Sequence, residues 1–268
     1  MDISLSGRTA IVTGGSKGLG RAIAAEFVAS GADIMICARG REALEATVAS
    51  ISAQSAGSSG QGNNARGRIA GVVADVGRAN DVQNVFDETM SAFGKVDIVV
   101  NNAGVLRMGA FEALTDEALQ EDLEQKLFAA IRLTRLAWPQ LKERHWGRIL
   151  NVLSIGARAL GAGSAPTSIS RAAGLALTKV LAGEGAPHNV LVNALLVGFI
   201  ESDQHVRTAA RNGVPYRDHI TQRGRAIPLG RLGTEAEFAN LACFLASDAA
   251  SYITGSAINI DGGLSPLP

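Results

Sequence analysis

Glycines cluster in residues 13–20 (TGGSKGLG), between an apolar run and a helix-like stretch. Glycine lets backbone N–H groups approach a pyrophosphate closely, and it adopts the positive φ that such a tight turn needs. The N-terminus of the helix that follows adds partial positive charge. Glycine triplets also occur in ordinary turns, but the strand–turn–helix context predicts a dinucleotide-binding site here.

The end of the second apolar run indicates which dinucleotide binds. An NAD site usually carries a carboxylate there, which accepts hydrogen bonds from the adenine ribose. This chain has Cys37, Ala38 and Arg39 at that place and no acid. Arg39 and Lys17 could flank a 2′-phosphate, and the alternative interpretation is that both are solvated surface cations. We expect NADP(H) to be favoured over NAD(H).

Seven apolar runs of strand length alternate with helical patterns along the chain. Consecutive apolar residues, such as Ile98, Val99 and Val100, indicate strands that are buried on both faces. The alternation implies right-handed crossovers, so we expect one Rossmann-type α/β domain over residues 1–268, with a seven-stranded parallel sheet and helices on both faces. The expected strands are 9–13, 33–37, 69–74, 96–101, 148–153, 190–196 and 257–260, and the expected helices include 21–30 and 42–53.

Two segments read as irregular. Residues 50–67 are rich in Ser, Gly, Ala, Gln and Asn, which is typical of a helix end followed by a mobile surface loop. Residues 201–225 are polar and follow the sixth expected strand. We expect both segments to lie outside the regular α/β framework.

Composition narrows the function classes. The formal net charge is zero and no long Lys/Arg run occurs. The sequence therefore shows no basic patch of the kind that binds nucleic acids or anionic membranes. Cys37 and Cys243 lie in apolar stretches and are predicted to be buried. The histidines show no metal-ligand spacing, and we expect no metal site. The sequence contains no apolar run of about 18 residues, the length that a membrane span needs. We expect a cytoplasmic protein.

Several motifs together resemble the short-chain dehydrogenase/reductase family, in the subgroup of 3-oxoacyl-ACP reductases. They are the turn at 13–20, Asn101-Asn102-Ala103-Gly104, Asp75-Val76, and residues 228–231 and 259–263. The resemblance implies an NAD(P)(H)-dependent oxidoreductase acting on a small carbonyl or alcohol substrate, assembled as a tetramer or dimer through helices within 114–144 and 165–186. The cofactor-binding residues that it implies are Thr13, Gly14, Ser16, Lys17, Gly18, Leu19, Gly20, Arg39, Asp75, Val76, Asn102, Ala103, Gly104, Arg171, Gly198, Ile200 and Ser202.

The family's chemistry uses a Tyr-x-x-x-Lys pair, a preceding serine and an asparagine in a long helix. Ser154 falls at the serine position, and the family's usual interval from it places Thr167 at the tyrosine position and Arg171 at the lysine position. The asparagine position falls on Lys126, or on Gln125 if the register is off by one. The resemblance therefore implies an atypical catalytic set of Ser154, Thr167, Arg171 and Lys126.

This replacement changes the acid–base chemistry. A tyrosine phenol, with a pKa near 10, is a far stronger acid than the aliphatic hydroxyl of Thr167. Arg171 stays protonated, so it could hold a ribose but could not relay a proton. Lys126 could compensate, because burial and a neighbouring cation lower a lysine pKa and would make it a general acid near neutral pH. The alternative interpretation of Lys126 is an exposed helix lysine beside Glu124.

Two functional hypotheses follow. The first is an oxidoreductase with a rebuilt proton path, in which Ser154 holds the substrate oxygen, Arg171 holds the ribose, and Lys126 or water moves the proton. The second is a cofactor-binding homologue with little or no turnover, acting as a sensor, scaffold or partner subunit. By resemblance, residues 201–225 are a mobile substrate lid, whose arginines could attract an anionic substrate or form a solvated face.

Overall fold

The computed structural model describes residues 3–56 and 67–267, in which seven strands form one parallel sheet. The strand order is β3-β2-β1-β4-β6-β8-β9, and every neighbouring pair is parallel. The central strands are buried along almost their whole length, as the continuous apolar runs predict. The strands are β1 (Thr9–Thr13), β2 (Asp33–Ala38), β3 (Ile69–Val73), β4 (Ile98–Asn101), β6 (Gly147–Ser154), β8 (Val190–Val197) and β9 (Ala257–Ile260).

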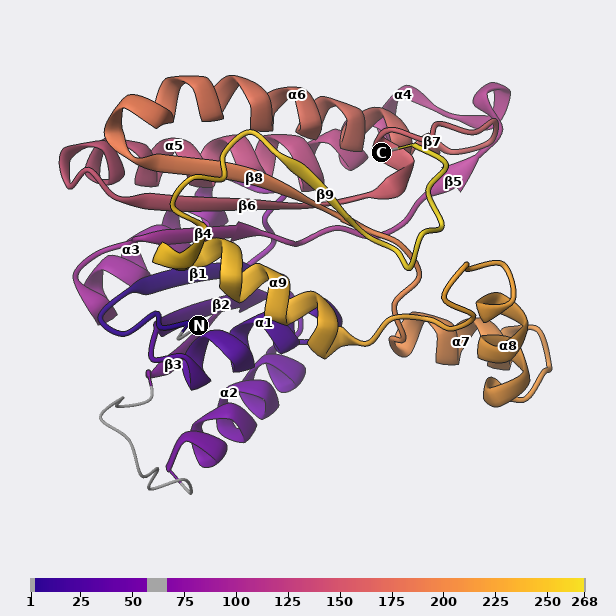
Figure 1. The fold of residues 1–268 in the computed structure, drawn as a ribbon, viewed down its shortest axis with the longest axis horizontal. Coiled ribbons are helices and arrows are strands. Elements are labelled where there is room, and N and C mark those ends of the chain that lie inside the picture. Colours follow the sequence, from indigo (N-terminus) through magenta and orange to yellow (C-terminus); the bar gives the residue numbers. More distant parts are fainter. Residues whose placement is uncertain (1–2, 57–66, 268) are drawn as a thin grey trace.

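Helices cover both faces of the sheet (Figure 1). One face carries α1 (Gly18–Ala29), α2 (Arg41–Ala56) and α9 (Glu235–Ala246). The other face carries α3 (Ala79–Phe93), α5 (Ala129–Glu143) and α6 (Thr167–Gly185). The expected Rossmann-type fold is confirmed.

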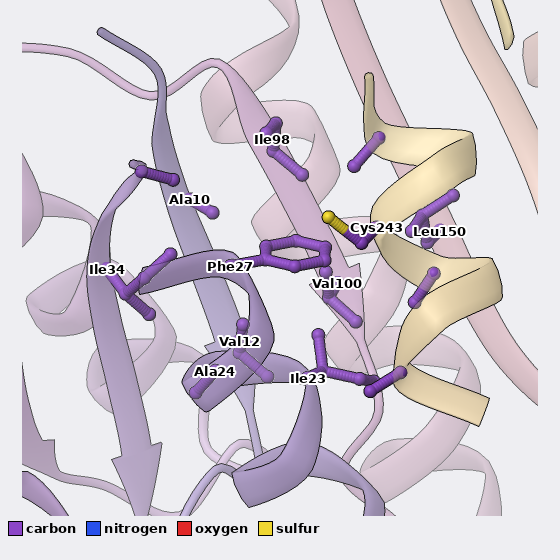
Figure 2. Close-up of a cluster of buried hydrophobic side chains, with 14 of the residues drawn as sticks. Ala10, Val12, Ile23, Ala24, Phe27, Ile34, Ile98, Val100, Leu150 and Cys243 are labelled. Atoms are coloured by element: carbon purple, nitrogen blue, oxygen red, sulfur yellow. The ribbon is translucent and has the colours of Figure 1, made fainter. Parts of the chain in front are cut away.

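The core under α1 and α9 is built from small and branched side chains. Phe27 of α1 is fully buried and lies near Val100 of β4 and Cys243 of α9 in Figure 2. Cys37 is fully buried on the opposite face of the sheet. Both cysteines are therefore buried side chains, as predicted.

The long helical region before β6 contains a local change of winding. It begins as α4 (Asp116–Leu123), which Thr115 caps by accepting a hydrogen bond from the Ala118 N–H. It continues through η2 (Glu124–Phe128), a π-helical stretch, directly into α5. A π-bulge turns side chains out of the regular helical register and is frequent at functional sites.

Most expected strands match within one or two residues, and the largest deviation is β4, which begins at Ile98 instead of residue 96. A small antiparallel pair was not foreseen, namely β5 (Met108–Gly109) with β7 (Ala165–Pro166). The structure adds the 3₁₀ turns η1 (Phe111–Ala113), η3 (Ile155–Ala157), η4 (Ala186–His188) and η5 (Asp248–Ala250).

The expectation of an irregular 201–225 segment is wrong. The segment contains α7 (Asp203–Arg211) and α8 (Tyr216–Gly224), which pack on each other. Both helices are short and mostly polar, and the helical spacing of Val206, Ala209 and Ala210 in α7 is too brief a pattern to identify a helix from sequence. Figure 1 shows them standing apart at the lower right, between the segment that leaves β8 and the segment that enters α9.

The expected loop at residues 50–67 falls largely on residues 57–66, which lie outside the described part of the chain, while α2 continues to Ala56. Among the described residues, no helix has the length and apolar character of a membrane span.

Candidate active site

The candidate site lies at the carboxyl ends of β1, β4, β6 and β8. The chain builds the sheet outward from β1 through β2 to β3, and β4 then starts on the other side of β1. Such a reversal of strand order opens a crevice beyond the carboxyl ends of the strands, where α/β proteins bind their ligands. The predicted site residues that follow β1, β4, β6 and β8 therefore lie at one edge of the sheet.

The glycine turn leaves no room for side chains. Gly14 has a φ of +67°, a conformation that residues with a Cβ rarely adopt. A Cβ on Gly20 would lie 2.5 Å from Nδ2 of Asn102 and closer still to the carbonyl oxygen of Gly14. Lys17 occupies the N-cap of α1, and its own side chain makes no capping hydrogen bond. Backbone N–H groups at the start of a helix suit an anion.

Thr13 ties this turn to the end of β4. Its Oγ1 accepts hydrogen bonds from the N–H groups of Asn102 and Ala103, each at 3.0 Å, and donates to the carbonyl oxygen of Val100. The Asn102 side chain donates in return to the Thr13 carbonyl oxygen at 2.8 Å. These contacts fix the spacing between the glycine turn and the Asn102–Gly104 segment.

The end of β2 lies against the same turn, because the Gly15 N–H donates to the Cys37 carbonyl oxygen at 3.1 Å. The Thr47 hydroxyl of α2 donates to the Ser16 carbonyl oxygen. Arg39 and Lys17 are both exposed, and neither forms an ion pair with a described residue. Two exposed cations therefore lie beside the glycine turn, Lys17 within it and Arg39 just after β2.

A buried polar cluster lies beside this edge of the sheet, next to Gly104. Lys126 Nζ donates to Asp122 Oδ1 at 2.5 Å and to Thr167 Oγ1 at 2.9 Å. The side chains of Lys126 and Asp122 are each 1% exposed. The second oxygen of Asp122 accepts a hydrogen bond from Ser170 Oγ at 2.6 Å. The cluster therefore joins α4, η2 and the first turn of α6.

Thr167 has a distinctive set of partners. Its Oγ1 accepts from Lys126 Nζ and also from the backbone N–H of Arg107 at 2.9 Å. A hydroxyl has two acceptor positions and one proton to donate. Both acceptor positions are occupied here, so the Thr167 proton is left to donate to a group outside these contacts.

Burial lowers the pKa of Lys126 from its usual value to about 8. The hydrogen bond and the charge of Asp122 oppose this shift, whereas the positive charges of Arg171 and Arg107 add to it. The alternative of an exposed lysine beside Glu124 is wrong, because Glu124 pairs instead with Arg132 at 2.6 Å. Lys126 thus has the lowered pKa that its sequence position predicts.

Arg171 and Ser154 complete the corner. Nη1 of Arg171 donates to the Val152 carbonyl oxygen at 2.5 Å, and its Nη2 lies beside Gly104. Burial lowers the pKa of Arg171 to about 10, against the opposing charge of Asp122. Ser154 is the last residue of β6, and its partly exposed hydroxyl caps no backbone group of the turn that follows.

Comparison with known proteins places this site in a family. A family model described as enoyl-(acyl carrier protein) reductase matches residues 14–265. The chain is 32% identical to the 3-oxoacyl-[acyl-carrier-protein] reductase of Aquifex aeolicus over 264 residues, covering 98% of this chain and 100% of the relative. The chain belongs to the short-chain dehydrogenase/reductase family. It is an oxidoreductase of that family.

Solved structures of short-chain reductases agree with this assignment. L-sorbose reductase from Gluconobacter frateurii, complexed with NADPH and L-sorbose, superposes with a TM-score of 0.92 at 30% identity and full coverage of both chains. An NADPH-bound short-chain oxidoreductase from Pseudomonas aeruginosa PAO1, described as containing an atypical catalytic center, superposes with a TM-score of 0.89 at 36% identity over 99% of each chain.

The remaining predicted cofactor positions of this short-chain dehydrogenase/reductase lie around the same crevice. Asp75 follows β3, and its Oδ1 accepts a hydrogen bond from the Gly77 N–H, while Val76 is buried against α3. Gly198 follows β8 and donates to the Ile260 carbonyl oxygen, and Ile200 bridges to Gly233. Leu19 packs on the α1 core, Gly18 opens α1, and Ser202 precedes α7.

The structure places Lys126 and Gln125 differently and adds residues that sequence reasoning missed. Lys126 reaches Thr167, whereas Gln125 lies beside Gly77. Asp122 and Ser170 were not singled out from the sequence, although both are buried in the cluster. The four-residue spacing of Asp122 and Lys126 on a helix was the available signal, because side chains four apart share one helix face.

Proposed function

We propose that this protein is an NADPH-dependent carbonyl reductase in which Thr167 and Lys126 together deliver the proton. The observation that carries the proposal is the 2.9 Å hydrogen bond between Lys126 Nζ and Thr167 Oγ1. It pairs a buried amine, whose pKa is lowered to about 8, with a hydroxyl whose own proton is free to donate.

The crevice fits a dinucleotide. The side-chain-free turn at Gly14 and Gly20 and the N-terminus of α1 would hold the pyrophosphate. Lys17 and Arg39 would flank a 2′-phosphate, which favours NADPH over NADH. The NADPH complexes of the Gluconobacter frateurii and Pseudomonas aeruginosa neighbours support this preference. When bound, the cofactor would supply a hydride to the substrate carbonyl carbon.

The protein's own residues must stabilise the negative charge that develops on the substrate oxygen during reduction. We assign to Ser154 a hydrogen bond to that oxygen, since its hydroxyl lies at the end of β6 and is partly exposed. Thr167 donates its proton to the oxygen as negative charge develops, and Lys126 Nζ replaces that proton on Thr167 Oγ1. Threonine is thus never left as an alkoxide. General acid catalysis of this kind contributes about 10²–10⁴ in rate.

Thr167 must stand between Lys126 and the substrate because the lysine side chain is only 1% exposed. Arg171 cannot take the same part, since a guanidinium stays protonated. Its role in this proposal is to hold the nicotinamide-ribose end beside Gly104 and, by its positive charge, to lower the pKa of Lys126.

The second candidate is a cofactor-binding homologue with little or no turnover. The observation that favours it is the burial of Thr167, which is 5% exposed. NADPH and NADH binding is measured by fluorescence, and carbonyl and alcohol substrates are then screened. Turnover by the wild type supports the reductase. Binding without turnover, with activity gained in the Thr167→Tyr/Arg171→Lys/Lys126→Asn variant, supports the second candidate. Lys126 is replaced because its Nζ occupies the space beside the residue-167 hydroxyl.

Two features of the family complete the proposal. We propose that α7 and α8 form a movable substrate cover, since they follow β8 beside the crevice (Figure 1). We also propose a homo-oligomer formed through α5 and α6, because Ile169 and Val180 of α6 and Phe128, directly before α5, are exposed apolar side chains. Light scattering after size-exclusion chromatography tests the second point: a monomer at micromolar concentration contradicts it.

A further inference from the structure

Asp122 is a buried carboxylate whose two oxygens are both engaged. Oδ1 accepts from Lys126 Nζ and Oδ2 accepts from Ser170 Oγ. We propose that Asp122 is the positioning residue of this centre, which aims the Lys126 ammonium at Thr167 and keeps it protonated for the reduction. This inference rests on the proposed function of Lys126.

The geometry forms a closed ring of four residues, which passes through both the hydroxyl and the main-chain carbonyl oxygen of Thr167. Lys126 contacts Asp122 and Thr167, and Ser170 Oγ lies 2.6 Å from Asp122 Oδ2 and 3.0 Å from the Thr167 carbonyl oxygen. A lysine ammonium sits on a flexible four-carbon chain, so one hydrogen bond does not fix its position. Asp122 supplies the second anchor, and Ser170 fixes the carboxylate that provides it. Asp122 acts only through Lys126, because its carboxylate oxygens contact Lys126 Nζ and Ser170 Oγ and not Thr167 Oγ1.

The charges around Lys126 come from three directions. Asp122 faces it from α4, Arg171 from α6, and Arg107 from the segment before β5. Asp122 is the acid in this set, and it faces two cations besides the ammonium itself. Without that carboxylate, the ammonium would be buried beside two like charges with no compensation, so the neutral amine would be favoured.

The test compares Asp122→Asn with the wild type, and Asp97→Asn serves as the matched control. Asp97 is also a buried carboxylate with a side chain 2% exposed, but it pairs with Lys95 and Arg144 at the opposite end of the sheet. Asparagine keeps the size of the side chain and removes its charge. We expect Asp122→Asn to move the alkaline fall of kcat to lower pH by about one to two units. The KM for NADPH should stay unchanged, and Asp97→Asn should leave the pH profile in place.

Ser170→Ala gives a milder test of the same ring. It leaves the carboxylate charge in place and removes one of its hydrogen bonds, so we expect a smaller shift of the alkaline limb. This variant keeps the proposal testable if Asp122→Asn does not fold. A loss of kcat in either variant without movement of the pH profile would show a structural role only and would overturn the proposal.

A second readout does not depend on turnover. The lysines of the chain are Lys17, Lys95, Lys126, Lys142 and Lys179, so their ¹³C-labelled ε-carbons give a sparse NMR spectrum in which Lys126→Met identifies one signal. The titration midpoint of Lys126 should fall in Asp122→Asn, while the other midpoints stay in place. An unchanged midpoint would refute the role of Asp122. If the Lys126 midpoint falls in Asp122→Asn but the wild type shows no turnover, the proposed function is refuted instead.

Discussion

The glycine turn at residues 13–20 (the phosphate turn of the proposed function) and the Lys126–Thr167 corner lie at the same edge of the sheet, and in that proposal they work by opposite means. The turn would act through backbone groups, and binding would depend on the absence of side chains at Gly14 and Gly20. At the corner, function depends on which side chains meet, as Lys126 and Thr167 do. A backbone site tolerates almost no substitution, whereas a side-chain site can be rebuilt from other residues on an unchanged frame.

Removing the amine gives the largest expected effect on the corner. Lys126→Met should lower kcat by about 10²–10⁴ because the proton source of Thr167 is lost. NADPH affinity should stay the same, since the phosphate turn lies elsewhere. Steady-state kinetics and fluorescence binding measure the two quantities. The rebuilt proton path is wrong if Lys126→Met keeps full turnover while Ser154→Ala abolishes it.

Adding one methyl group at the turn should instead break binding. Gly20→Ala places a Cβ within 2.5 Å of Asn102 Nδ2 and against the Gly14 carbonyl, so the backbone must move. Overpacking costs about 1–3 kcal/mol, and we expect NADPH affinity to fall by about 100-fold. Gly40→Ala is the matched control, because no atom lies within 4 Å of its added Cβ. Equal affinities in the two variants would contradict the importance of the close contacts.

The pH profile should separate the two regions. Reduction needs the Lys126 ammonium, whose pKa is lowered to about 8, so kcat should be highest below that pH and fall about tenfold per unit above it. The reverse oxidation needs the neutral amine and should rise over the same range. NADPH binding should show no transition near pH 8. A flat rate profile between pH 7 and 10 would exclude Lys126 as the proton source.

Cofactor choice should respond to one exposed side chain. Arg39→Ala removes a cation that follows β2, and we expect about tenfold weaker NADPH binding, equivalent to about 1.4 kcal/mol. NADH binding should hardly change, because it lacks the 2′-phosphate. Raising the salt concentration should reduce the difference between wild type and variant. Arg41→Ala, whose guanidinium pairs with Glu45, provides the matched surface control.

The sequence predicts the sheet well because its strands are mostly apolar, and the five central ones are buried almost throughout. Seven runs of apolar residues locate seven strands, and β1 and β9 match to the residue. The helices α7 and α8 could not be recognised, since their stability does not come from an apolar stripe along their length. The π-helical turn at 124–128 has no period of its own and could not be read either.

The candidate site, like the fold, could be predicted from the sequence only in part. Motif spacing located Ser154, Thr167, Arg171 and Lys126, because each lies a fixed interval from a strand end or a glycine turn. It did not reveal that Lys126 is buried or that Asp122 holds it, since burial depends on the packing of α4 against α6. Side-chain contacts between elements distant in sequence are decided by tertiary structure.

The closed ring of contacts limits how this centre could mutate back to a tyrosine–lysine pair. Changing Lys126 alone leaves Asp122 buried without its counterion, which costs about 3–5 kcal/mol when a buried pair is broken. Changing Thr167 alone to tyrosine adds a ring at a position whose hydroxyl oxygen now lies 2.9 Å from the Lys126 ammonium. Each single change is therefore expected to lower the stability of the protein. Restoring the tyrosine–lysine pair without that loss would require several of these residues to change together.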